Sequence, residues 1–161
     1  MASDFLLELE GIKGESQDKA KSATIEVASF NWGVSNSGAS GSGGGGGASK
    51  ASFSDISFMC STNVASTSLF LRCVNGKPIP KATLHVRKQG ETPKEYYTII
   101  LTDCLISGFQ ANGSDGSGSL PMESFSLNFA KIEFEYKPQK ADGTLDTAVK
   151  TGWDLKANAK V

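Results

Sequence analysis

Hydrophobic and polar residues alternate along most of this chain. At the start, Phe5, Leu7 and Leu9 alternate with Glu8 and Glu10, which predicts a half-buried strand that ends near Gly11. The same period of two predicts further strands at about 24–35, 50–61, 82–88, 95–109, 124–136 and 151–156. The pattern therefore indicates a mainly β protein, and we expect one domain over residues 1–161.

One segment follows a helical period instead. Ser66 is the expected N-cap, and Asn75-Gly76 is a stop signal, after which Pro78 prevents continuation. The apolar residues at helical spacing are Leu69, Phe70, Cys73 and Val74. A helix of about ten residues is marginal alone, so we expect its apolar face to dock on the sheets.

The segment at 124–136 changes its phase. Phe125, Leu127 and Phe129 set one apolar face, but Ile132 and Phe134 continue on the opposite parity. Such a slip near residues 130–131 indicates either a β-bulge or a change of strand partner. Both alternatives favour a closed or nearly closed β structure, that is, a β-barrel.

A glycine-rich segment at about 36–49 joins two strands of this expected barrel, so we do not place a domain boundary there. A long loop inside a compact domain is usually functional or disordered, and its composition permits both. The run lacks the Gly-Lys-Ser/Thr ending of a phosphate-binding loop and precedes a strand instead of a helix.

Charge and composition exclude several functions. The 16 basic and 17 acidic side chains leave a net charge of -1, which argues against nucleic acid or an anionic membrane as a partner. Cys60, Cys73 and Cys104 are widely spaced and are expected to be buried, reduced thiols. The single histidine, His85, is expected on a solvated strand face. We predict no catalytic residue, no metal and no cofactor, and therefore no enzyme.

The N-terminus has no basic region ahead of an apolar run, and no apolar run reaches the ~20 residues of a membrane span. We therefore expect a protein made in the cytoplasm without a cleavable signal peptide and without stable membrane insertion.

Six motifs in order resemble one protein family, the haemolysin-coregulated proteins (Hcp) of type VI secretion. The motifs are the opening strand with Gly14-Glu-Ser16, Phe30-Asn-Trp-Gly-Val-Ser35, the glycine run ending in Ala48-Ser-Lys50, Cys73-Val-Asn-Gly-Lys77, Asn128-Phe-Ala-Lys131 with the turn 136–143, and Thr151-Gly-Trp-Asp-Leu155. Together they span essentially the whole chain. The helix start departs from the family pattern, because 63–67 lacks the usual proline.

The resemblance implies a compact antiparallel β-barrel of two sheets with one short flanking α-helix. It also implies a structural subunit whose hexameric rings stack into a tube that is propelled into target cells. By the same resemblance, partners are other copies of the chain, the spike and sheath components and small effectors in the ring lumen, and the machine itself secretes the protein. The resemblance places Asn31 on the lumen side, and strand parity puts Ser29 on the same face. It assigns ring stacking to a loop containing Ser37, Gly38, Ser40, Gly43, Gly44, Gly45, Gly46, Gly47, Ser49 and Lys50.

Two other functions remain open from the residues themselves. A monomeric ligand-binding β-barrel would enclose a small molecule between apolar strand faces, with the glycine run as a mouth loop. A hydrolase would need a polar cluster around His85 or Asp103, which no motif in the sequence demands.

Overall fold

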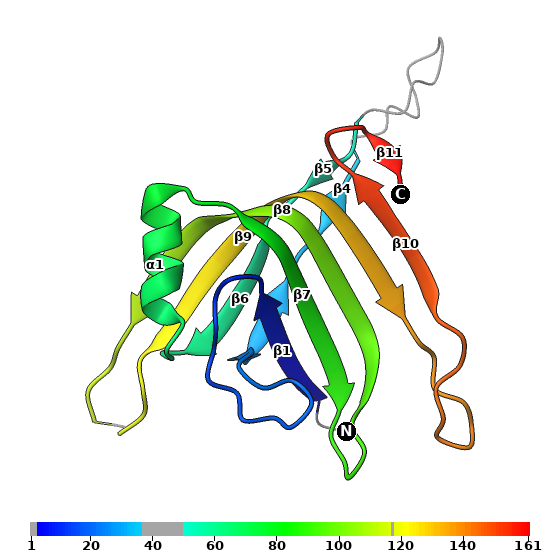
Figure 1. Cartoon of the computed structure of the whole chain (residues 1–161), viewed down its shortest axis with the longest axis horizontal. Coiled ribbons are helices and arrows are strands. Elements are labelled where there is room, and N and C mark those ends of the chain that lie inside the picture. The colour runs from blue at the N-terminus through cyan, green and yellow to red at the C-terminus, as the bar shows by residue number, and fades with distance from the viewer. Residues whose placement is uncertain (1–2, 37–49, 117) are drawn as a thin grey trace.

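The computed structural model describes residues 3–36, 50–116 and 118–161 (Figure 1). One helix accompanies strands that differ widely in length. The elements are β1 (Ser3–Leu9), β2 (Ile25–Val27), β3 (Ser29–Asn31), β4 (Val34–Ser35), β5 (Ser52–Phe53), β6 (Ile56–Ser61), α1 (Ser66–Asn75), β7 (Ile79–Lys88), β8 (Lys94–Asn112), β9 (Met122–Tyr136), β10 (Val149–Asp154) and β11 (Ala159–Lys160).

Every strand pairing among the described residues is antiparallel. The main sheet runs in the order β11-β10-β9-β8-β7-β1-β2, with β6 and β3 attached through β9, while β4 and β5 form a separate two-stranded sheet. The mainly β, antiparallel fold with one short helix is therefore confirmed. The strand order is open, so the expected closure of a barrel is not confirmed.

The predicted strand at 24–35 is divided into three short strands. Its first part, β2, pairs with β1, and its second part, β3, pairs with β6. Ala28 lies between them, and its N–H donates to the carbonyl of Met59 at 2.7 Å. This segment therefore connects the two sides of the bent sheet.

The phase slip at 124–136 is explained by a change of partner. β9 pairs with β6 over Met122–Leu127 and with β10 over Lys131–Tyr136, while β8 stays beside it throughout. The bulge between β8 and β9 lies elsewhere, at Ile106/Gly108. In β8 the buried parity also inverts, at Asp103, which adopts a positive φ of 54°. Both strands thus turn their apolar residues into one core on either side of the bend.

The core lies between the two sides of the bent sheet. Phe58 of β6 and Phe125 of β9 are both almost fully buried, with ring centroids 5.4 Å apart. A second group of rings joins Phe30 to Phe5 at 5.3 Å and to Tyr97 at 5.8 Å. Each such buried side chain stabilises the fold by about 1.5–3 kcal/mol.

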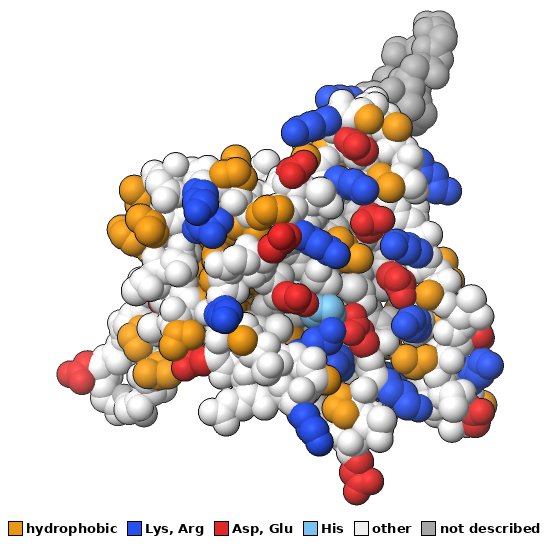
Figure 2. Space-filling view, viewed as in Figure 1, with side chains coloured by type: hydrophobic (Ala, Val, Ile, Leu, Met, Phe, Trp, Pro, Cys, Tyr) orange, Lys and Arg blue, Asp and Glu red, His pale blue; other side chains and the backbone are white. Residues whose placement is uncertain are grey.

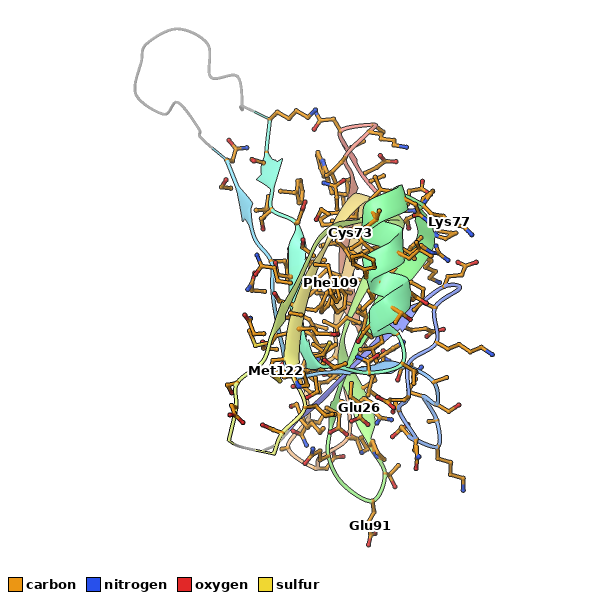
Figure 3. The ribbon with its side chains drawn as sticks, turned by 90° about the vertical axis from the view of Figure 1, so that its left-hand side faces the viewer. Glu26, Cys73, Lys77, Glu91, Phe109 and Met122 are labelled. Atoms are coloured by element: carbon orange, nitrogen blue, oxygen red, sulfur yellow. The ribbon has the colours of Figure 1, made fainter. Side chains whose placement is uncertain are left out.

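The helix α1 covers one edge of the core, against β8 (Figure 3). Leu69 is fully buried, and Phe70 contacts Phe109 of β8 at a centroid distance of 6.4 Å. The predicted stop is confirmed, because Gly76 is the C-cap with φ 67°. The predicted N-cap is wrong: Ala65 holds that position without a side-chain cap, and Ser66 begins the helix.

Ser66 serves a different purpose. Its hydroxyl donates to a carboxylate oxygen of Glu123 at 2.6 Å, and the Thr62 hydroxyl donates to the other oxygen at 3.1 Å. Glu123 is only 4% exposed on β9. A buried carboxylate needs such donors, and the Ser66 oxygen in turn accepts from the Asn63 N–H at 3.0 Å.

Burial of the cysteines is confirmed for two of them. Cys60 and Cys104 are fully buried, and desolvation raises the pKa of their thiols to about 11 and about 12. Cys73 on α1 is only partly buried. The buried thiols behave as small apolar side chains.

Candidate functional site: a neutral face opposite a charged face

The two predicted lumen residues lie on β3 and point outward. Ser29 and Asn31 are exposed, whereas Phe30 between them turns inward onto the aromatic core. This alternation is what a two-residue period requires. Their side chains are therefore available to a partner.

The residues paired with Ser29 and Asn31 on neighbouring strands continue this outward-facing surface across four strands. In one row, Ser29 of β3 pairs with Met59 of β6, which pairs with Ser124 of β9, which pairs with Gln110 of β8. Directly paired residues project from the same side of a sheet. The row thus forms a continuous outward-facing band.

A second row runs beside the first. Asn31 pairs with Ser57, Ser57 with Ser126, and Ser126 with Gly108. We name these eight residues the serine face: Ser29, Met59, Ser124, Gln110, Asn31, Ser57, Ser126 and Gly108. None carries a formal charge, and five lie along a shallow depression, namely Ser57, Gly108, Gln110, Ser124 and Ser126.

The serine face is dense in small hydrogen-bonding groups. The Ser126 hydroxyl lies 2.8 Å from that of Ser107, and a side chain at Gly108 would come within 3.1 Å of Ser126. Hydroxyls and amides both donate and accept hydrogen bonds. The face can therefore contact polar groups of many kinds without selecting a charge.

The outward side of β1, β7 and β8 is of the opposite character (Figure 2). His85 lies there with Nδ1 at 2.8 Å from Glu95 and Nε2 at 3.1 Å from Glu8. It is 7% exposed, so the expected solvated position is wrong. The flanking carboxylates of two neighbouring strands cover the ring, and the sequence of β7 alone does not reveal them.

Ion pairs and hydrogen bonds fix the carboxylates of this charged face. Burial raises the pKa of Glu95, but hydrogen bonds from His85 and Thr98 outweigh it and lower the pKa to about 2. The Arg87 guanidinium bonds Asp18 at 2.6 and 3.1 Å and holds the pKa of that carboxyl at about 2. Asp18 belongs to the segment between β1 and β2, and its ion pair with Arg87 holds this segment against β7.

The predicted stacking loop is described only at its base. Gly33 donates its N–H to the Ser54 hydroxyl at 2.9 Å and accepts from the Ser54 N–H at 2.9 Å, which joins the β4 and β5 segments. Lys50 is exposed just before β5. The other residues assigned to the loop lie outside the described residues: Ser37, Gly38, Ser40, Gly43, Gly44, Gly45, Gly46, Gly47 and Ser49.

The sequence motifs missed most of the serine face. Ser124 and Ser126 alternate with buried Phe125 and Leu127, and Ser57 lies between buried Ile56 and Phe58, so polar parity was a visible signal. The pattern alone does not state which strands are neighbours. Ser54 was also missed, because nothing local pairs it with Gly33.

Within the described parts of the chain, no three His, Cys, Asp or Glu side chains are grouped so as to hold a metal ion. No helix in those parts is long and apolar enough to cross a bilayer.

The fold defines an antiparallel β-sheet protein with one uncharged outward face and one charged outward face. The family model described as "Type VI secretion system effector, Hcp" matches residues 6–136. Protein hcp1 of Pseudomonas aeruginosa PAO1 is 40% identical over 162 residues, which cover 99% of each chain.

Solved structures agree with that match. A structure described as a type six secretion system protein has a TM-score of 0.94 at 28% identity, covering 99% of this chain and all of the other. Hcp1 from Salmonella typhimurium has a TM-score of 0.80 at 30% identity, with both chains fully covered. The chain belongs to the Hcp family, a family of secreted structural proteins of type VI secretion.

Proposed function

We propose that this chain is the subunit of a hexameric ring, that the rings stack into the type VI secretion tube, and that the serine face lines the lumen. The observation that supports the lumen assignment is the pair of uncharged rows across β3, β6, β9 and β8. A lumen that accommodates different small effectors needs hydrogen-bonding groups without a fixed charge, since unpaired charges discriminate strongly between partners.

The exposed side of α1 supports self-association. Phe70, Leu71 and Val74 are 55%, 56% and 68% exposed, which is unusual for large apolar residues so close together. A head-to-tail contact that rotates by about 60° per subunit closes into a ring of six. We assign this side of α1 to the contact between subunits.

The alternative function, a monomeric ligand-binding barrel, finds less support. Phe58, Phe125, Ile56 and Leu127 are almost fully buried and fill the space between the two sides of the sheet, where a ligand would have to lie. Dense packing of this kind is what an ordinary core requires.

Residues 37–50 supply the stacking contact in this proposal, and the spike, the sheath and small effectors are the other partners. In this proposal the chain leaves the bacterial cell through the type VI machine itself. Deleting Gly43–Gly47 is expected to leave rings intact and to shorten or abolish tubes. Tubes of normal length from that variant, judged in the intact secretion system, would remove the loop from this role.

Ring formation is tested by light scattering on a size-exclusion column with electron micrographs of the same peak. We expect open rings at six times the chain mass of 16.9 kDa. A species that stays at 16.9 kDa at high concentration would contradict the ring.

The lumen assignment has a separate test. In a Cys73→Ser background, Ser57→Cys should react with a small maleimide but not with a maleimide attached to a globular protein wider than the lumen. Glu15→Cys, on an exposed part of the β1–β2 segment, is the control and should react with both. Equal labelling of Ser57→Cys by both reagents in assembled tubes would place the serine face outside the lumen.

A further inference from the structure

A hollow lies where four neighbouring strands of the main sheet meet at one end. Ser3 of β1 pairs with Lys88 of β7, β7 pairs with β8 up to Lys94, and β8 pairs with β9 up to Tyr136. Figure 1 shows these strand ends along its lower edge. The hollow has a volume of about 370 Å³ and is lined by Ser3, Lys88, Tyr96, Tyr136, Lys137 and Gln139. We name these six residues the two-lysine pocket.

The lining combines two positive charges with hydroxyl and amide groups, and none of its described residues is a carboxylate. Lysine, tyrosine, serine and glutamine side chains all donate hydrogen bonds. The acids close by in the sequence have other partners. The Asp4 carboxylate accepts from Gln89 at 2.7 Å. The Asp142 carboxylate accepts from the Thr144 hydroxyl at 2.6 Å. The pocket therefore offers donors and positive charge to a ligand.

Lys88 is a half-buried ammonium that forms no ion pair within the described chain. Its Nζ donates to the side chain of Gln139 and lies 5.6 Å from the centroid of the Tyr96 ring. Both contacts are with neutral groups, so its charge is not compensated. A partly desolvated charge without a counter-charge is costly, and an anion in the pocket would reduce this cost.

Other contacts hold the pocket in shape without a ligand. The hydroxyls of Ser3 and Tyr96 lie 2.8 Å apart, and the Lys137 N–H donates to the Tyr96 carbonyl at 2.8 Å. The Lys137 ammonium lies 3.7 Å from Glu135, and its side chain is 40% exposed. An exposed pair of this kind is weak, so Lys137 can turn to an anion. Tyr136 is exposed at the rim.

We propose that the two-lysine pocket binds the phosphate group of a small phosphate monoester. Two ammonium groups match the charge of about −1.5 to −2 that such a phosphate carries at neutral pH, and its three acceptor oxygens suit the surrounding donors. A carboxylate, with a single charge, would compensate only one lysine. The exposed ring of Tyr136 provides an apolar face for the organic group of the ester. This inference does not depend on the proposed ring.

Equilibrium dialysis of the full chain against phenyl phosphate, at fixed ionic strength, tests the proposal. We expect one saturable site per chain at about pH 7.5, and binding several-fold weaker at about pH 5, where the phosphate loses one charge and the lysines keep theirs. Phenol is the neutral control and should not bind. Uptake that does not saturate, or equal uptake of phenol, would overturn the proposal.

Inorganic phosphate distinguishes a free phosphate ion from a monoester. Under the same conditions it should bind at least about threefold more weakly than phenyl phosphate, because it lacks a group that packs on Tyr136. Equal or tighter binding of inorganic phosphate would contradict the assignment of a monoester.

Two double variants with the same change of net charge separate the pocket from general attraction. Lys88→Gln with Lys137→Gln should weaken the binding of phenyl phosphate by about tenfold or more. Lys156→Gln with Lys160→Gln alters exposed lysines in the β10–β11 turn and in β11, which Figure 1 shows at the opposite end, and should leave binding unchanged. Equal weakening by both pairs would refute the site.

Thermal unfolding provides a second measurement. Phenyl phosphate should raise the Tm of the wild type and of the Lys156→Gln/Lys160→Gln variant, but not that of the Lys88→Gln/Lys137→Gln variant. Should this last variant fail to fold, Lys137→Gln alone, at a half-exposed side chain, should weaken binding by about threefold or more. Unchanged binding by the single variant would contradict the proposal.

Discussion

The pairing of Glu95 with His85 predicts a specific acid sensitivity of the fold. Glu95 accepts from His85 at 2.8 Å and from the Thr98 hydroxyl at 2.6 Å, and its side chain is 27% exposed. We expect Glu95→Gln to remove a contribution to stability that depends on pH. The exposed Glu91, at the tip of the β7–β8 turn, provides the matched control, Glu91→Gln.

The size of this pH-dependent contribution follows from the change in the pKa of the Glu95 carboxyl on folding. Its pKa falls from 4.5 to about 2 on folding. Because the folded pKa is lower, the stabilisation is fully present above the unfolded pKa and is lost as pH falls from 4.5 towards about 2. One pKa unit corresponds to about 1.4 kcal/mol, so the free energy of unfolding should lose about 3 kcal/mol over this window.

Urea unfolding at fixed chain concentration, followed by the fluorescence of Trp32 and Trp153, measures this effect. The wild-type and Glu91→Gln proteins should lose stability more steeply on acidification than Glu95→Gln, and their extra loss of unfolding free energy should reach about 3 kcal/mol by the folded pKa. If wild type and Glu95→Gln instead give parallel curves of stability against pH, Glu95 is not held by His85 and Thr98 as described.

Two further predictions concern local packing. A Cβ at Gly14 would lie 2.3 Å from the carbonyl oxygen of Thr24, so Gly14→Ala should lower the free energy of unfolding by about 2 kcal/mol or more. The control Gly113→Ala, with open space around it, should change that free energy by less than about 0.5 kcal/mol. Equal effects of the two substitutions in thermal unfolding would contradict the close approach at Gly14. Ser66→Ala removes a donor from buried Glu123 and should cost about 1–3 kcal/mol in chemical unfolding, and a neutral result would show that Glu123 does not depend on Ser66.

The sequence-based predictions were wrong where a residue's environment is supplied by another strand. His85 alternates with Leu84 and Val86, which correctly predicts that it faces away from the core. Its burial comes from Glu8 and Glu95, which are far away in sequence or across a turn. Ser66 has the residue type of an N-cap, but the helix is capped at Ala65, and the Ser66 hydroxyl donates to buried Glu123 on β9.

The sequence by itself determined the period of each strand, the single helix with its end at Gly76, and the motifs that resemble the Hcp family. These features depend on residues close together in the chain, where parity, capping and turn preferences act. Only the tertiary structure decided that β9 exchanges β6 for β10 after Leu127, and that Asn31, Ser57, Ser126 and Gly108 form one row. The physical reason is that parity fixes which side of its own strand a residue faces, whereas long-range register and packing fix its neighbours.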